Sequence, residues 1–89
     1  MLRNSMVINK EDKVAVLLEN AEEGDTIAAN GEKIMLLEPV EFAHKVAIKD
    51  IPKGGPVIKY GEEIGYALEN IPKGAWIHRH NMGCDRGKK

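Results

Sequence analysis

Two histidines near the end of the chain, His78 and His80, are separated by a single residue. The segment Ala75 to His80 is interpreted as a β-strand, and residues two positions apart on a strand face the same side. Both imidazoles should therefore project from one face while Arg79 points away. Two such rings could share a divalent metal or act together on one substrate. The structural alternative, which stays open, is a pair of exposed histidines bonded to water or to backbone.

A second pair of residues, His44 and Lys45, could join the same site. If the fold brings His44 near His78, side chains from two separate turns converge, as a small polar site requires. Lys45 offers a compact positive charge that suits a carboxylate. Asn81 could cap a turn or offer its amide to a hydroxyl ligand. The structural alternatives are a lone histidine after a turn and a lysine on a solvated strand flank.

Two further residues, Trp76 and Cys84, could take part in chemistry but are expected to have no catalytic role. Trp76 should anchor the core or an interface, because its bulk can fill the centre of a small domain. Cys84 is the sole cysteine, which excludes an intramolecular disulfide. It lies in a basic segment, 83–89, that we expect to be a flexible tail after one domain spanning residues 1–82. A nucleophilic cysteine needs a positioned base nearby, and a frayed end supplies none.

Size and composition indicate one ordinary globular domain. The chain has 89 residues, of which 43% are hydrophobic and 30% charged, unlike a disordered tail. A net charge of −1 and an aromatic content of 4% argue against nucleic-acid binding. No apolar run approaches the roughly 18–20 residues that span a bilayer. The first six residues lack the features of a secretory signal, so we expect a cytoplasmic protein.

The apolar pattern predicts an all-β chain of about seven short strands, because apolar residues nowhere recur with helical spacing. A continuous apolar run at 13–18 is typical of a strand buried on both faces. Asn30-Gly31 lies between two strand-like segments, at 26–29 and 32–37, and predicts a hairpin with a type I′ turn.

The remaining strands are expected at 7–8, 45–49, 57–58, 64–68 and 75–80. The segment at 45–49 alternates between apolar and polar residues. Its period of two places Val46 and Ile48 inward, and Ala47 outward with the two lysines. The segment at 7–8 is expected to be a short edge strand.

One turn pattern recurs four times, beginning at Ala21, Val40, Ile51 and Ile71. An apolar residue is followed by two positions that often hold proline or an acid, then by a small residue, and three positions later by a β-branched residue. In the two Ile-Pro-Lys-Gly copies, proline at the second position of the turn presets φ, and glycine two places later tolerates a positive φ. This recurrence favours a compact, curved β fold over a flat meander.

Together with these turns, the segments Val57-Ile58-Lys59-Tyr60-Gly61 and Trp76-Ile77-His78-Arg79-His80-Asn81 resemble the small N-terminal domain of the altronate and galactarate dehydratases. That domain belongs to the SAF group, which has a β-clip fold. The resemblance covers roughly residues 7 to 82 and implies a compact β-clip domain. One departure is Ala43, where the family usually has glycine before His-Lys.

The resemblance also implies a reaction. Dehydratases of this family remove water from an aldonic or aldaric acid, with a divalent metal such as iron(II). On this view the chain is the small subunit of a sugar-acid hydro-lyase, inactive alone and paired with a separate large subunit. His44, His78 and His80 would be catalytic, and Lys45 and Asn81 would contact the sugar acid. His78 and His80 could also ligate the metal, which the large subunit could hold in the main.

Other functions fit the same residues. The similar small subunit of sulfolactate sulfo-lyase has the same layout and expels sulfite instead of water. A module of this fold could also merely bind a carbohydrate or acidic ligand, or stabilise a larger partner, because fold does not fix function. The unpaired strand edges of a small β domain could also drive self-association into a homo-oligomer.

Overall fold

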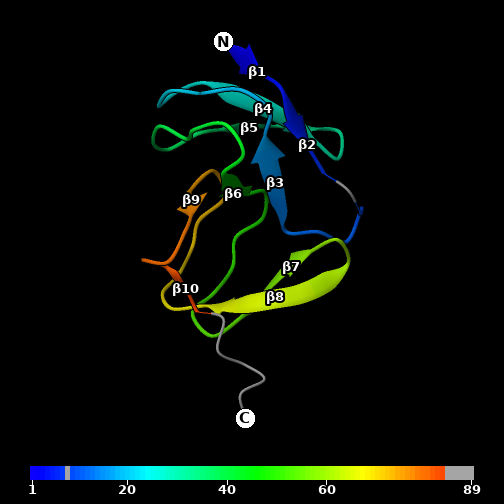
Figure 1. Ribbon diagram of the computed structural model, residues 1–89, viewed down its shortest axis with the longest axis vertical. Coiled ribbons are helices and arrows are strands. Elements are labelled where there is room, and N and C mark those ends of the chain that lie inside the picture. The colour runs from blue at the N-terminus through cyan, green and yellow to red at the C-terminus, as the bar shows by residue number, and fades with distance from the viewer. Residues whose placement is uncertain (8, 84–89) are drawn as a thin grey trace.

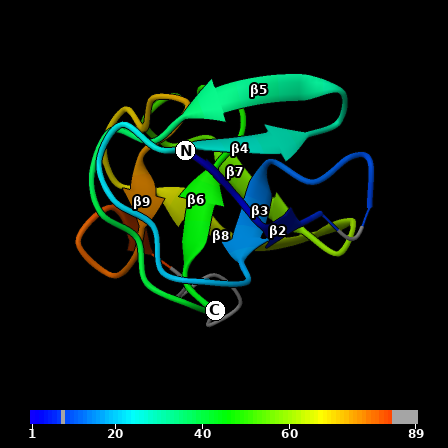
Figure 2. The ribbon, with the colours of Figure 1, turned by 90° about the horizontal axis from the view of Figure 1, so that it is seen from above.

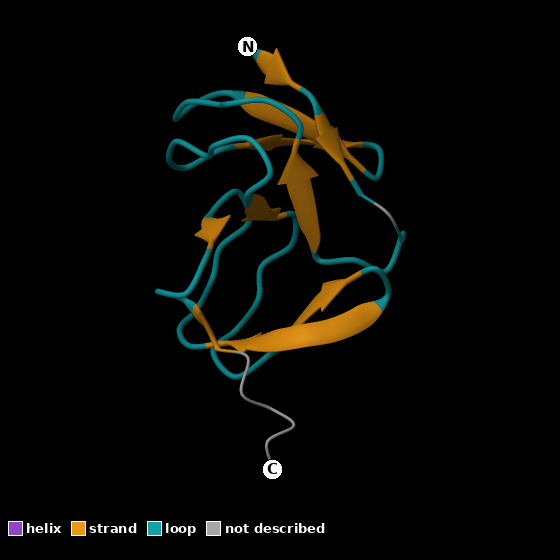
Figure 3. Cartoon of the chain, viewed as in Figure 1, coloured by secondary structure: helices purple, strands orange, loops and turns teal. Residues whose placement is uncertain are grey.

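The fold is built from short β-strands. A computed structural model describes residues 1–7 and 9–83 of the chain. This part contains ten strands and no helix, and so no helix that could cross a membrane (Figure 3). The strands are β1 Leu2–Arg3, β2 Ser5–Met6, β3 Val14–Leu17, β4 Thr26–Ala29, β5 Glu32–Met35, β6 Lys45–Ala47, β7 Pro56–Lys59, β8 Glu62–Ala67, β9 Trp76–Ile77 and β10 Met82–Gly83. The prediction of an all-β chain is confirmed.

Three small sheets follow one another along the long axis of a molecule that measures 42 × 23 × 20 Å (Figure 1). Their strand orders are β1-β4-β5, β2-β3-β6-β9 and β10-β8-β7. The first sheet lies at the N-terminal end, the β7–β8 hairpin lies at the opposite end, and the second sheet lies between them. Seen from above, β4 and β5 run across the direction of β3 and β6 (Figure 2), as in orthogonally packed sheets.

The second sheet is buried on both faces. On β3, Ala15 and Leu17 belong to one hydrophobic cluster and Val14 belongs to another, and on β6 Val46 and Ala47 are divided in the same way. Because successive side chains of a strand point to opposite faces, the two clusters lie on opposite sides of this sheet. The first cluster includes residues of β4 and β5, and the second includes residues of β7 and β8.

The outward orientation predicted for Ala47 is therefore wrong. Ala47 is 0% exposed, as Val46 is, because the layer formed by β7 and β8 covers the face that would otherwise meet solvent. The doubly buried strand predicted at 13–18 is confirmed for β3. Leu18, which follows the end of β3, is 45% exposed.

Two hairpins have the same turn chemistry. Asn30-Gly31 joins β4 to β5 with φ of 51° and 81°, which confirms the predicted hairpin. Tyr60-Gly61 joins β7 to β8 with φ of 59° and 74°. The second turn is anchored by the buried Asp12, whose Oδ1 accepts a hydrogen bond from the N–H of Gly61 at 2.7 Å.

The four repeated turns also adopt one backbone conformation. The small residue of each copy has a positive φ: 90° at Gly24, 74° at Ala43, 84° at Gly54 and 95° at Gly74. In each turn the N–H of the next residue donates to the carbonyl three positions earlier. This is the geometry of a turn that requires positive φ at its third position. In the two Ile-Pro copies the proline is the first residue of that turn and not, as predicted, the second, because the N–H groups of Gly55 and Ala75 donate to the proline carbonyls.

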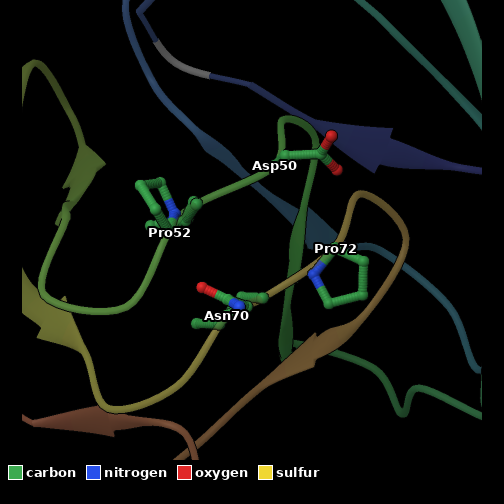
Figure 4. A pocket seen from close by; sticks show the side chains of 6 residues that line it. Asp50, Pro52, Asn70 and Pro72 are labelled. Carbon is green, nitrogen blue, oxygen red and sulfur yellow. The ribbon is translucent and has the colours of Figure 1, made fainter.

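The turns are held together in pairs. Ile51 and Ile71 form an antiparallel bridge with two reciprocal hydrogen bonds of 2.8 Å. Beside it, Asp50 Oδ1 accepts from the N–H of Lys73 at 2.8 Å, and Asn70 Oδ1 accepts from the N–H of Lys53 at 2.9 Å. Each Ile-Pro copy therefore holds the other. Figure 4 shows Asp50 and Pro52 of one copy and Asn70 and Pro72 of the other.

The ends of the domain differ from the prediction. The edge strand expected at 7–8 is replaced by β2, which ends at Met6, and residue 8 lies outside the described part. At the other end Gly83 belongs to β10, which pairs with β8. Residues 84–89, which include Cys84 and the rest of the expected tail, also lie outside the described part.

Candidate active site

The strand expected at Ala75–His80 is much shorter in the structure. β9 ends at Ile77, and the chain then turns, because the carbonyl of His78 accepts hydrogen bonds from the N–H groups of Asn81 and Met82 at 3.1 and 2.9 Å. The prediction of an extended segment through His80 is therefore wrong. A local side-chain interaction has replaced strand pairing at this point.

That interaction comes from Asn81, a buried residue that is 3% exposed. Its Oδ1 accepts from the N–H of His78 at 3.0 Å, and its Nδ2 donates to the carbonyl of Trp76 at 2.9 Å. Both polar atoms are thus used inside the turn, which favours the interpretation of Asn81 as a turn-forming residue. Direct contact between Asn81 and a substrate stays a prediction.

The turn brings two histidine rings onto Trp76. The Trp76 and His78 rings are stacked, with centroids 5.0 Å apart and an interplanar angle of 12°. The His80 ring lies 5.2 Å from Trp76 at 45°. His44, from a different turn, lies 5.6 Å from both Trp76 and His78. The histidine cluster, defined here as His44, His78 and His80, therefore contains all three histidines of the chain.

The pairing of β6 with β9 creates this convergence. The register places Lys45 opposite Ile77 and Val46 opposite Trp76. His44 therefore precedes one strand at the point where His78 follows the other. The repeated turn also holds His44 directly, because its N–H donates to the carbonyl of Glu41 at 3.0 Å.

A small cavity lies beside the cluster. It has a volume of about 270 Å³ and is lined by Pro39, Glu41, His44, Trp76 and His78. His80 contacts Trp76 without lining this cavity. Neither Lys45 nor Asn81 lines it, although Lys45 follows His44 directly.

A larger pocket of about 560 Å³ lies elsewhere, between the paired Ile-Pro turns (Figure 4). It is lined by isoleucine and proline together with Asp50 and Asn70. The Oδ1 atoms of these two polar residues already accept hydrogen bonds from backbone N–H groups. None of the histidines lines this pocket, whereas His44 and His78 line the smaller cavity.

The environment of His78 favours its neutral form. Partial burial is the largest cause that lowers the pKa of His78, followed by the positive charge of Arg79 and by smaller effects of other basic groups around the ring, among them Lys45. Both effects disfavour adding a proton to the imidazole. At neutral pH, His78 is therefore predominantly uncharged and can accept a proton or donate a lone pair.

The described residues do not by themselves form a metal site with three protein ligands. Within residues 1–7 and 9–83, no three side chains of the His, Cys, Asp or Glu type are grouped so that they could hold a metal ion. Metal ligation by His78 and His80 stays a prediction, and it requires further ligands from outside the described residues. The sequence-based interpretation had missed how Trp76 contacts all three histidines. Its position two residues before His78 was the available signal.

Comparison with known proteins identifies the family. The profile described as "Altronate/galactarate dehydratase SAF domain" matches residues 3–85. The chain belongs to this family. The match includes the whole histidine cluster and Trp76, and the family resemblance inferred from the sequence is confirmed.

Curated relatives show how the family domain is used. Altronate dehydratase of Escherichia coli (strain K12) is 43% identical over 74 residues, which cover 83% of this chain and 15% of that protein. Galactarate dehydratase (L-threo-forming) of the same strain is 41% identical over 71 residues, covering 79% of this chain and 13% of that protein. The chain thus spans only a small part of the length of these dehydratases.

A third relative is itself short. The (2R)-sulfolactate sulfo-lyase subunit alpha of Paracoccus pantotrophus is 40% identical over 47 residues, which cover 53% of this chain and 70% of that protein. The family domain therefore occurs both as a small part of large dehydratases and as most of a separate subunit.

Proposed function

We propose that this chain is the small subunit of a sugar-acid dehydratase and supplies His44, His78 and His80 to an active site completed by a separate large subunit. The observation that carries the proposal is the convergence of these three histidines around Trp76, from two separate turns. Family membership supports the class of reaction, the elimination of water from a sugar acid. We expect the assembly to work in the cytoplasm.

The small size of the cavity supports the need for a partner. Ligand pockets usually enclose about 300–1,000 Å³, whereas the cavity beside His44 and His78 has about 270 Å³. Of its five lining residues, only Glu41, His44 and His78 have polar or ionisable side chains apart from the indole of Trp76, too few to contact every group of an acid that carries several hydroxyls. A second protein surface laid against this rim would enclose the ligand and supply the missing polar contacts.

The residues of the cluster can divide the work of the elimination. His78, held uncharged by its surroundings, can take the weakly acidic proton next to the substrate carboxylate. Lys45 and Arg79 contribute positive charge beside it, which favours binding of the carboxylate. Asn81 maintains the turn that presents His78.

We assign the metal mainly to the large subunit, with iron(II) as the expected ion. A divalent metal supplies Lewis-acid stabilisation of the negative charge that develops next to the carboxylate. The described residues of this chain do not provide three grouped ligands, so His78 and His80 could serve only as additional ligands.

One observation favours a second candidate, the small subunit of a sulfolactate sulfo-lyase. The aligned region covers 70% of the subunit alpha of Paracoccus pantotrophus, against 15% of the altronate dehydratase of Escherichia coli. Expulsion of sulfite also begins with removal of a proton next to a carboxylate, so the same histidines could serve both reactions.

Co-expression with the large subunit tests the proposal and separates the two reactions. The purified complex would be assayed anaerobically with iron(II) against a panel of sugar acids and against sulfolactate. Formation of a 2-keto-3-deoxy acid supports the dehydratase, and release of sulfite supports the sulfo-lyase. A complex that binds ligand but turns over neither class would favour a module that only binds or stabilises.

A further inference from the structure

Trp76 makes a hydrogen bond that defines one ring nitrogen of His44. The indole Nε1–H donates to His44 Nδ1, with the two nitrogens 3.0 Å apart. An indole nitrogen can only donate, so Nδ1 must accept with a lone pair. A neutral imidazole with a lone pair on Nδ1 carries its proton on Nε2. We propose that Trp76 is a positioning residue that holds His44 as the Nε2–H tautomer, so that His44 presents a hydrogen-bond donor to the ligand of this site.

The indole is held in place from several sides. The backbone N–H of Trp76 donates to Glu38 Oε2 at 3.0 Å, and its carbonyl accepts from Asn81 Nδ2 at 2.9 Å. Its ring packs against the first hydrophobic cluster and stacks on His78. A ring constrained by strand pairing, side-chain bonds and stacking keeps its N–H directed at His44.

The backbone that carries the His44 ring is held by two hydrogen bonds. The N–H of His44 donates to the carbonyl of Glu41, and its carbonyl accepts from the N–H of Leu17, each at 3.0 Å. Within the described residues, Nε2 has no hydrogen-bond partner, and no side-chain nitrogen or oxygen is both buried and unsatisfied. Nε2 is therefore accessible to solvent, on a ring that lines the 270 Å³ cavity.

This assignment gives the two adjacent histidines different roles. His44 offers an N–H, whereas His78, 5.6 Å away, offers a lone pair because burial and nearby positive charge lower its pKa. A neutral imidazole that gave up its only N–H proton would become an anion, so His44 acts by hydrogen bonding and not as a proton source. While the indole bond is intact, His44 also cannot ligate a metal through Nε2. The use of this donor in catalysis rests on the proposed function, but the tautomer does not.

Nitrogen NMR of the ¹⁵N-labelled chain tests the proposal directly. Long-range ¹H–¹⁵N correlations distinguish protonated from unprotonated ring nitrogens. In the wild-type chain we expect His44 Nε2 to resonate as a protonated nitrogen and Nδ1 as an unprotonated one. We also expect a scalar coupling between Trp76 Nε1 and His44 Nδ1 through the hydrogen bond. A proton on Nδ1, or the absence of that coupling, would overturn the proposal.

Variants separate the hydrogen bond from simple packing. Trp76→Phe keeps an aromatic ring but lacks the donor, so the His44 Nδ1 signal should move toward the protonated position. The control His80→Gln removes another ring in contact with Trp76 and should leave the His44 signals unchanged. If Trp76→Phe does not fold, the presence or absence of the scalar coupling between Trp76 Nε1 and His44 Nδ1 in the wild-type chain supports or overturns the proposal. Because neither substrate nor large subunit is present, failure of the dehydratase proposal would leave this result standing.

Discussion

Asn81 Oδ1 accepts a hydrogen bond from the backbone N–H of His78 at 3.0 Å. Asn81, which directly follows His80 in the sequence, therefore fixes the backbone that carries the His78 ring. Through its Nδ2, the same amide also binds the carbonyl of Trp76. One buried side chain thus links the aromatic centre of the site to the turn that carries two of its histidines.

Replacing this amide should destabilise the domain. Asn81→Ala removes two hydrogen bonds and leaves the backbone groups of Trp76 and His78 without their partners, at a cost of about 2–3 kcal/mol. For a domain of this size the melting temperature should fall by about 10–20 °C. The control Asn70→Ala removes one exposed bond to Lys53 and should cost only about 0.5–1 kcal/mol. Equal losses in the two variants would contradict the role given to Asn81.

Ala43 is a site where glycine should stabilise the fold. Its φ of 74° is a conformation that L-residues avoid. Relief of this strain exceeds the extra entropy that glycine loses on folding, so Ala43→Gly should gain about 0.5–1 kcal/mol. Ala28→Gly, in the middle of β4, should lose a similar amount. Chemical denaturation of the three proteins measures both changes, and a loss of stability in Ala43→Gly would refute the expectation.

Asp25 should make the domain sensitive to acid. Its pKa is lowered to about 2, first by the N–H of Glu22 and then by the guanidinium of Arg3. The folded state holds this proton less tightly than the unfolded chain, so the stabilisation is complete above the ordinary value of 3.8 and is lost as pH falls toward about 2. Urea unfolding at several pH values measures the effect. Asp25→Asn should be less stable at neutral pH and should lose less stability across that range.

Local features of the sequence predicted local structure well. Asn30-Gly31 and the glycines of three of the four repeated turns readily adopt a positive φ, so the hairpin and these turns could be predicted. In the fourth turn the recurring pattern was the signal, because alanine at position 43 does not favour its φ of 74°. The burial of Ala47 could not, because it depends on the distant β7–β8 layer that covers it.

The sequence raised the possibility that His44 approaches His78, and in the structure their rings are 5.6 Å apart. The geometry around them could not be predicted. The strand expected through His80 ends early because Asn81 forms its bonds inside the turn. The bond from Trp76 to His44 joins residues 32 positions apart, a contact that no local pattern encodes.

The most direct test of the account measures the turnover of the assembled enzyme with His78 replaced. His78→Ala should lower kcat by about 10²–10⁴-fold, as expected for loss of a general base, while the small chain still co-purifies with the large subunit. The control Lys49→Ala, an exposed lysine outside the cluster, should keep full activity. In the wild-type enzyme the acid limb of kcat/KM should lie below the ordinary histidine value of 6.5. Undiminished turnover by an intact His78→Ala complex would contradict the account.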